Sequence, residues 1–319
     1  MPRRAPHCQS MPSPVPGPDI VRRFIFERHP VRGHWVRLQD AWRELRSHAD
    51  HPPAVTALLG EAVAAAVLLA ATLKFRGMLT FQLQGNGAVR LLVAQCTHDF
   101  RLRAVARCDA AALSSLGGEV HREGLFRQLA GTDGRITVTV EAEERSMRYQ
   151  GVVPLSGGSL AESLAAYFAS SEQLPTRVAL AANDASVGGI LVQRLPEAGA
   201  GEPEEVAEAW DNAQRGISTL SPHALLEGRP EELLTQGFPG HDLRLFRGAP
   251  VRFECRCSEG RVAGLLRALG PEEVRGVLKE QGSVTVTCEF CRRPYRFGPV
   301  DVEALFTTPP LSGGSEAIH

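Results

Sequence analysis

The stretch Val284-Thr-Val-Thr-Cys288-Glu-Phe-Cys291 decides the fold at the end of the chain, together with Cys255-Arg-Cys257 thirty residues before it. Two close pairs of thiolates are the ligand set of a closed, tetrahedral zinc site. The surrounding unit, residues 251–306, has a thin apolar core, and a metal often supplies the missing stability in units of this size. The sequence therefore predicts one zinc ion bound by Cys255, Cys257, Cys288 and Cys291.

The spacing of the cysteines leaves three interpretations of this cluster open. An inert structural zinc is the most common use of such a pattern. A redox switch is favoured by the first pair, because a disulfide across a single residue closes a small, strained ring, and strained disulfides are readily reduced. A thiol-disulfide oxidoreductase is the third interpretation, but the βαβ context that it requires around Cys288 is missing.

A basic and aromatic patch lies next to the second cysteine pair, in Arg292, Arg293, Tyr295, Arg296 and Phe297. Such a patch could stack nucleic-acid bases, and a zinc-ribbon nucleic-acid-binding protein is therefore an alternative function. Nine basic and eight acidic residues nearly cancel over residues 251–306, however. We expect a solvated hairpin face here and no specific nucleic-acid partner.

The bulk composition points to a protein of the reducing cytoplasm. The chain has 319 residues and a net charge of −1, which indicates two or three domains without a general basic bias. Seven cysteines are an odd number, which fits poorly with the fully paired framework of a secreted protein. Cys8, Cys96 and Cys108 have no partner by spacing, and we expect them to be inert thiols.

Neither end of the chain predicts a folded element or a targeting signal. Residues 1–18 are rich in proline and lack an apolar stretch, so we expect a disordered tail, and residues 307–319 form a second tail. The most apolar segment runs from Glu61 to Phe75, and its uncharged part is twelve residues long. A membrane span needs about twenty residues, so this segment predicts a buried helix and no membrane partner.

Residues 19–195 predict one α+β domain, because strands come in runs with helices between them. Pro52-Pro53 begins a helix that extends to Lys74, with proline in the first turn, where its missing N–H is harmless. Gly85-Asn86-Gly87 predicts a hairpin between two strands. Arg32-Gly33 predicts an earlier turn. His29, His34, His48 and His51 show no metal-ligand spacing, and we expect surface histidines. No arrangement typical of an enzyme active site is present.

Residues 196–242 change in character, with ten acidic residues and two arginines. Glu204 to Leu220 and Pro230 to Gln236 predict helices, separated by glycine and proline. One interpretation is a solvated helical linker. The other is a helical segment that is only marginally stable unless it docks against a neighbour. The predicted architecture is thus an α+β domain, an acidic helical linker and a small zinc-binding domain, residues 243–306.

Taken together, these segments resemble the 33-kDa redox-regulated heat-shock chaperone family of bacteria over roughly residues 19–306. The first domain carries the resemblance in six motifs: Leu58-Leu59-Gly60-Glu61, Leu73-Lys74-Phe75-Arg76-Gly77, Gln82-Leu83-Gln84-Gly85, Tyr149-Gln150-Gly151-Val152-Val153, Ser171-Glu172-Gln173-Leu174-Pro175-Thr176 and Gly188-Gly189-Ile190-Leu191-Val192-Gln193. The last unit adds Leu269-Gly270-x-Glu272-Glu273 and both cysteine pairs.

The resemblance implies a holdase, a chaperone that binds unfolding proteins without ATP and without an active site. In the reduced state the four cysteines would hold one zinc ion and the protein would be idle. Oxidation would form the disulfides Cys255–Cys257 and Cys288–Cys291, release the zinc and activate binding of unfolded clients. The resemblance also implies that the activated protein is a homodimer.

Overall fold

The computed structural model describes residues 18–115, 124–143, 148–196 and 202–307. The chain forms two compact units. The first comprises residues up to Glu44 and His51–Phe253, and the second comprises Leu45–Asp50 and the residues from Glu254 onward. The predicted tails, residues 1–18 and 307–319, lie almost entirely outside the described residues.

The first unit contains a sheet with the strand order β10-β1-β2-β9-β8, in which all neighbours are antiparallel and β11 also pairs with β1. Segments far apart in the sequence thus meet in one sheet. Its strands are β1 (Ile20–Phe26), β2 (Val31–Leu38), β8 (Thr176–Ala182), β9 (Val187–Arg194), β10 (Leu243–Leu245) and β11 (Ala249–Pro250).

A second sheet in the same unit has the order β12-β5-β4-β3-β6-β7. The predicted hairpin is confirmed, because β3 and β4 pair in register on either side of Gly85–Gly87. Along β3, buried and half-buried residues alternate, as expected of a sheet with one face in the core. The strands are β3 (Gly77–Gln84), β4 (Val89–Thr97), β5 (Arg101–Cys108), β6 (Arg135–Ala142), β7 (Arg148–Pro154) and β12 (Arg252–Phe253).

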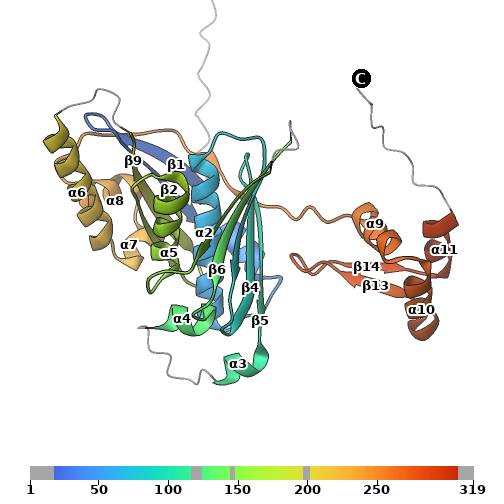
Figure 1. The fold of residues 1–319 in the computed structure, drawn as a ribbon. Coiled ribbons are helices and arrows are strands. Elements are labelled where there is room, and N and C mark those ends of the chain that lie inside the picture. The colour runs from blue at the N-terminus through green and yellow to red at the C-terminus, as the bar shows by residue number, and fades with distance from the viewer. Residues whose placement is uncertain (1–17, 116–123, 144–147, 197–201, 308–319) are drawn as a thin grey trace, which may run out of the picture. The chain divides into compact units, whose positions relative to one another are not determined.

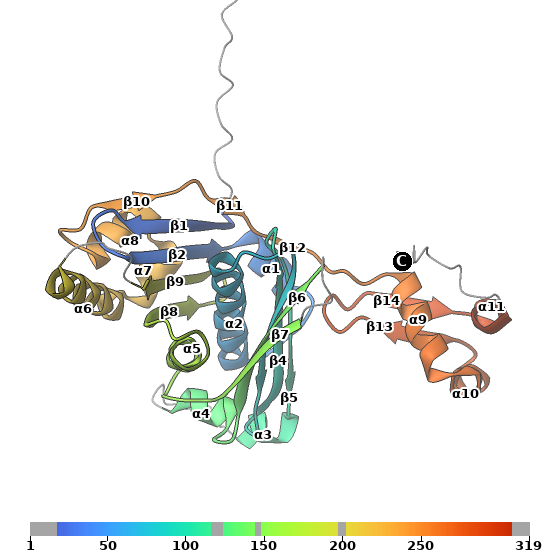
Figure 2. The ribbon, with the colours of Figure 1, turned by 45° about the horizontal axis from the view of Figure 1, so that its top comes forward.

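The apolar helix α2 (Pro53–Thr72) lies between the two sheets and contacts strands of both (Figures 1 and 2). By length and composition this helix could cross a membrane, but most of its residues are buried within the unit, which is the pattern of a core helix. The predicted apolar helix is therefore confirmed, although it ends at Thr72, two residues before the expected Lys74. The remaining helices before residue 200 are α1 (Asp40–Arg46), α3 (Ala110–Ser115), α4 (Leu125–Ala130), α5 (Leu160–Tyr167) and the π-helix η1 (Phe168–Glu172).

The acidic segment forms three helices, α6 (Pro203–Thr219), α7 (Pro222–Glu227) and α8 (Pro230–Gly237), which pack on the first sheet. Trp210, Ile217 and Phe238 are buried in a cluster with residues of β1, β2 and β9. Polar contacts add to this packing, since Arg22 of β1 forms an ion pair with Glu231 of α8 at 2.7 Å. The interpretation as a solvated linker is therefore wrong, because the helices are amphipathic and dock through their apolar faces.

The second unit contains α9 (Glu259–Leu269), α10 (Pro271–Gln281), the hairpin of β13 (Val284–Thr287) and β14 (Pro294–Phe297), and α11 (Pro299–Thr307). Its buried core is small and consists of Val262, Ala263, Leu266, Val274, Val284, Phe297, Val302 and Leu305. The α+β class is confirmed. The predicted start of this domain at residue 243 lies ahead of the structural division, because β10 and β11 pair with β1 of the first unit.

Two local predictions are wrong. Gly33 lies within β2 rather than in a turn, and the chain turns before Val31. A glycine is needed there because a Cβ would lie 2.1 Å from the ring of Phe24 on the neighbouring strand. His34 is not on the surface: it is 4% exposed, and its Nδ1 has no hydrogen-bond partner among the described residues. A sequence pattern does not reveal such cross-strand packing.

Candidate metal centre

Two short connecting segments of the second unit position the four cysteines. Cys255 and Cys257 precede α9, whose first turn is capped by Ser258, because the Ser258 side chain accepts a hydrogen bond from the backbone of Arg261. The guanidinium of Arg261 also donates to the backbone oxygen of Arg256, at 2.6 Å. These contacts fix the backbone on both sides of Cys257.

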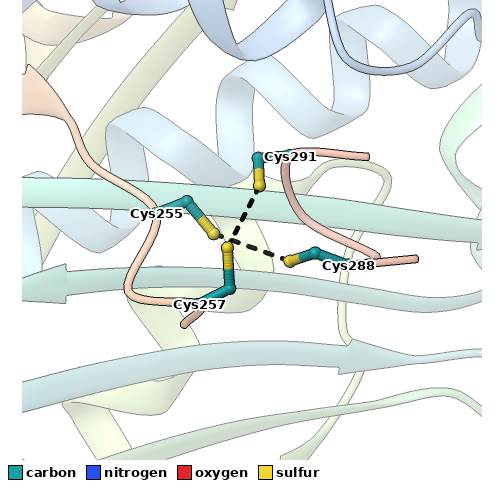
Figure 3. A group of neighbouring side chains, drawn as sticks. All are labelled: Cys255, Cys257, Cys288 and Cys291. Atoms are coloured by element: carbon teal, nitrogen blue, oxygen red, sulfur yellow. Dashed lines mark hydrogen bonds between the residues drawn. The ribbon is translucent and has the colours of Figure 1, made fainter. Parts of the chain in front are cut away.

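The second pair lies on the tight turn that joins β13 to β14. The backbone of Cys288 donates to Arg293, at 2.9 Å, and the backbone of Arg292 donates back to Cys288, at 2.8 Å. Arg292 has a φ of 56°, in the left-handed region that a tight turn requires. This turn directs the side chains of Cys288 and Cys291 toward those of the first pair (Figure 3).

The four sulfur atoms lie close together, in an arrangement that can bind one tetrahedral metal ion. All four lie within 4.8 Å of one another. The Sγ atoms of Cys255 and Cys288 are 3.6 Å apart, and those of Cys257 and Cys291 are 3.4 Å apart. Sulfurs at about 2.3 Å from a central zinc ion lie about 3.8 Å from one another, so the arrangement requires little adjustment. The donor set is all sulfur, which suits zinc better than magnesium or calcium.

The thiols differ in their acidity because their surroundings differ. Burial opposes ionisation of Cys257, but hydrogen bonds from Tyr295 and the neighbouring cysteines outweigh it and lower the pKa of Cys257 to about 7. Burial raises the pKa of Cys255, and burial together with the neighbouring thiols raises the pKa of Cys291 to about 12. The thiols of Cys255 and Cys291 are therefore protonated at neutral pH and would release their protons on binding a metal cation.

Tyr295 is a functional residue of the cluster that the sequence analysis assigned to a surface patch. Its hydroxyl donates a hydrogen bond to Sγ of Cys257 at 3.1 Å. Phe297 of the same predicted patch is only 3% exposed and belongs to the core of the unit. Phe297 thus packs in the core of the unit, and the hydroxyl of Tyr295 is hydrogen-bonded to the cluster. The alternation of β14 could have revealed this, because Tyr295 and Phe297 share one face of the strand.

Two of the other cysteines lie apart from this cluster in the first unit. Cys96 is completely buried in β4, and burial raises its thiol pKa far above the usual range. Cys108 ends β5 half-buried, and burial also raises its pKa. Both are in the environment of unreactive thiols, because the thiolate is the reactive form. Cys8 lies outside the described residues.

Most of the chain is similar in sequence to one family of known proteins. A family model described as Hsp33 protein matches residues 19–298. A 33 kDa chaperonin of Methylobacillus flagellatus is 38% identical over 303 residues, which cover 94% of this chain and 99% of the relative. A 33 kDa chaperonin of Neisseria gonorrhoeae is 41% identical over 288 residues, which cover 90% of this chain and 91% of the relative.

A solved structure agrees with the fold. The crystal structure of the 33 kDa chaperonin (heat shock protein 33 homolog) of Thermotoga maritima superimposes with a TM-score of 0.75. The match covers 90% of this chain and 97% of that one at 24% identity. The sequence matches extend over the α+β unit, the docked helices and the cysteine cluster alike. The chain therefore belongs to the Hsp33 family of chaperones.

Proposed function

We propose that this protein is a redox-regulated, ATP-independent holdase that binds unfolding proteins under oxidative stress. The observation that carries the proposal is the convergence of four cysteines in a unit with a small apolar core, within a chain of a chaperone family. A unit whose stability depends on thiolate ligands responds directly to oxidants, because oxidation removes the ligands.

The proposed cofactor is one zinc ion, held by Cys255, Cys257, Cys288 and Cys291 in the reduced state. Zinc would cross-link the segment before α9 to the β13–β14 turn and keep the sulfurs as thiolates. The sulfur-only donor set and the short sulfur–sulfur distances support this assignment. Tyr295 would orient Cys257 through its hydroxyl.

Oxidation would join Cys255 to Cys257 and Cys288 to Cys291. For each pair, a thiolate attacks one oxygen of hydrogen peroxide and becomes a sulfenic acid, and the partner thiol displaces that oxygen to form the disulfide. Two thiols lose two protons and two electrons, and the peroxide leaves as two waters. All four sulfurs lie within 4.8 Å, so these pairs need no large movement. The pairing itself rests on the resemblance to the family.

Loss of the metal would be transmitted to the docked helices. The core of the second unit is small, so we expect the unit to depend on its cross-link and zinc release to unfold it. We propose that α6, α7 and α8 then leave the first sheet. The apolar face of β1, β2 and β9 that they cover, including Phe24, Trp35 and Ile190, would become available to unfolded clients.

The remaining parts of the proposal concern partners and location. The clients are unfolded or partly folded proteins, and the activated form is a homodimer. The protein acts in the cytoplasm and has no enzymatic turnover. It has no specific nucleic-acid partner and no membrane partner. The burial of Phe297 supports the nucleic-acid part, because this ring is not free to stack on bases.

The test is a paired measurement on the full chain. Zinc content and suppression of the aggregation of a thermally unfolding client are measured before and after hydrogen peroxide at raised temperature. We expect zinc release and a gain of suppression, both reversed by a reductant. Cys288→Ser should lose zinc and suppress aggregation without peroxide, and Cys108→Ser is the matched control that should behave as the parent protein.

Three results would overturn the proposal. Zinc that is retained under peroxide, without any gain of suppression, would return the cluster to a purely structural role. Turnover of a disulfide substrate by the oxidised protein would instead favour an oxidoreductase, and salt-dependent retention of DNA or RNA would favour a nucleic-acid-binding protein.

A further inference from the structure

An apolar cavity of about 250 Å³ opens within the first unit, where the end of α2 meets β6, β7, α5 and η1. Leu69, Val138 and Tyr167 line its interior and are almost completely buried. Leu73 and Tyr149 line it too, but they are 36% and 46% exposed and so lie toward its mouth. Large apolar side chains that remain exposed around a cavity mark a site for a ligand.

A single carboxylate gives this cavity a polar end. Oε1 of Glu172 accepts hydrogen bonds from the hydroxyls of Tyr149, at 3.3 Å, and Tyr167, at 3.4 Å. Burial raises the pKa of Tyr167, so its hydroxyl remains a donor. Within the described ranges no basic side chain forms an ion pair with Glu172, although Lys74 also lines the cavity. The carboxylate is thus oriented by its neighbours and has no ion-pair partner within the described ranges.

The backbone that carries Glu172 is unusual. Residues Phe168–Glu172 form a π-helix, and the following Gln173 has a φ of 54°. π-helical turns are rare and occur frequently at functional sites, and a left-handed conformation is strained in a residue other than glycine. This conformation places both Phe168 and Glu172 on the wall of the cavity.

The size of the cavity limits what it can hold. Pockets for drug-sized molecules measure about 300–1,000 Å³, whereas an apolar cavity of about 150 Å³ holds a benzene ring. A cavity of about 250 Å³ therefore suits one aromatic or large aliphatic side chain. The carboxylate beside it favours a cation on the same ligand.

We propose that this cavity binds one aromatic or large aliphatic side chain of an unfolded polypeptide that carries a lysine or arginine next to it. The proposal rests on the proposed holdase function and adds a defined contact site to it. All the elements that line the cavity belong to the first unit, and α6, α7 and α8 are not among them. A short peptide should therefore reach the cavity in the reduced and the oxidised protein alike, whereas binding of a whole unfolded client also needs the face of β1, β2 and β9 that α6, α7 and α8 cover in the reduced state.

The probe is N-acetyl-Phe-Lys-amide, with N-acetyl-Phe-Glu-amide as its charge-reversed partner, each titrated into the methyl-labelled full chain and followed by NMR. We expect shift changes at the methyl groups of Leu69, Leu73, Val138 and Val140, with dissociation constants that agree within about twofold between the two redox states. The Lys peptide should bind about three- to fivefold more tightly than the Glu peptide, as expected of one partly exposed ion pair.

Two variants separate the roles of the carboxylate and the cavity. Glu172→Gln keeps the shape of the side chain and should abolish the preference for the Lys peptide. Val140→Phe fills the cavity and should abolish binding of both peptides. Val152→Phe is the matched control, because Val152 belongs to β7 but is 54% exposed and does not line the cavity. If Val140→Phe fails to fold, the charge preference in Glu172→Gln still decides the question.

The inference is wrong if the chemical-shift changes fall outside the cavity, or if both peptides bind equally well. It is also wrong if the same methyl groups shift when the protein concentration alone is raised, because the mouth of the cavity would then be an interface between two copies of the chain. Its failure is distinct from that of the holdase. Full aggregation suppression by oxidised Val140→Phe would remove the cavity as a client site and leave the holdase intact. Peptide binding without any aggregation suppression would remove the holdase and leave the cavity as a peptide-binding site.

Discussion

At the scale of single residues, Tyr295 contacts the cysteine cluster directly, through the 3.1 Å hydrogen bond from its hydroxyl to Sγ of Cys257. Tyr295→Phe removes this hydrogen bond and leaves the ring in place. We expect the affinity for zinc to fall about tenfold, the lower end of what outer-shell partners of metal ligands contribute. Competition with a chromogenic chelator measures this affinity. Tyr149→Phe, which removes a hydroxyl of the first unit, should leave it unchanged.

His34 predicts a loss of stability in acid. Its burial, reinforced by Arg32 of β2 and Arg23 of β1, lowers its pKa from an ordinary 6.5 to about 3. Below pH 6.5 the unfolded chain gains a proton that the folded protein excludes, so the free energy of unfolding decreases as the pH falls toward 3. From pH 7 to pH 5 this residue should cost about 2 kcal/mol.

The substitution His34→Phe should remove this part of the pH dependence. Urea unfolding followed by tryptophan fluorescence measures it, since Trp35 and Trp42 are both buried in the first unit. His223→Gln, at an exposed position of α7, is the control and should stay within about 0.5 kcal/mol of the parent protein at both pH values. An unchanged acid slope in His34→Phe would show that another group titrates.

Residue-level features that depend on neighbours in sequence are the easiest to predict. Ser159, for example, caps α5 by accepting a hydrogen bond from the backbone of Glu162, three residues on. The glycines at residues 85 and 87 form the turn of the β3–β4 hairpin. The predictions for Gly33 and His34 are wrong because Phe24 and Arg23 of β1 face them across the strands, and the strand register is not visible in a local pattern.

At the scale of elements, the contact of α6 with the end of α8 is very close at Gly216. A Cβ on this residue would lie 1.7 Å from the backbone oxygen of Gly237. Gly216→Ala should therefore separate the two helices and loosen α6 from the first sheet. We expect aggregation suppression without peroxide, with zinc retained, and a shift of the emission of Trp210 to longer wavelength, because Trp210 lies buried on α6.

Gly276→Ala is the matched control for this substitution. Gly276 also lies within a helix, α10, but a Cβ there would meet nothing within 4 Å. The change should be neutral or stabilise the helix by up to about 1 kcal/mol, since alanine is the better helix former. If neither Gly216→Ala nor Gly276→Ala suppresses aggregation in the reduced state, the docking of α6 is not what prevents client binding.

At the scale of the whole molecule, the two units should respond differently to loss of the metal. The first unit has two sheets around a long buried helix, whereas the second has a core of eight residues, most of them aliphatic and none larger than Phe297. Removal of zinc by a chelator under reducing conditions should release amide protection in α9, α10 and α11 and leave β3, β4 and β6 protected.

Hydrogen exchange followed by mass spectrometry measures this difference. Added zinc should restore the protection, which separates metal loss from irreversible damage. Retention of protection in α9, α10 and α11 after complete metal removal would show that the second unit is stable by itself, and the coupling proposed between zinc release and activation would then lose its basis.

The sequence by itself determined the cysteine cluster, the apolar core helix, the β3–β4 hairpin and the helical nature of the acidic segment, because each depends on spacing or periodicity over a few residues. Only the tertiary structure decided that α6, α7 and α8 dock on the first sheet, that Tyr295 contacts Cys257, and that Glu172 borders an apolar cavity. These features arise where segments distant in sequence pack together, and burial in such contacts follows from the three-dimensional arrangement of both partners.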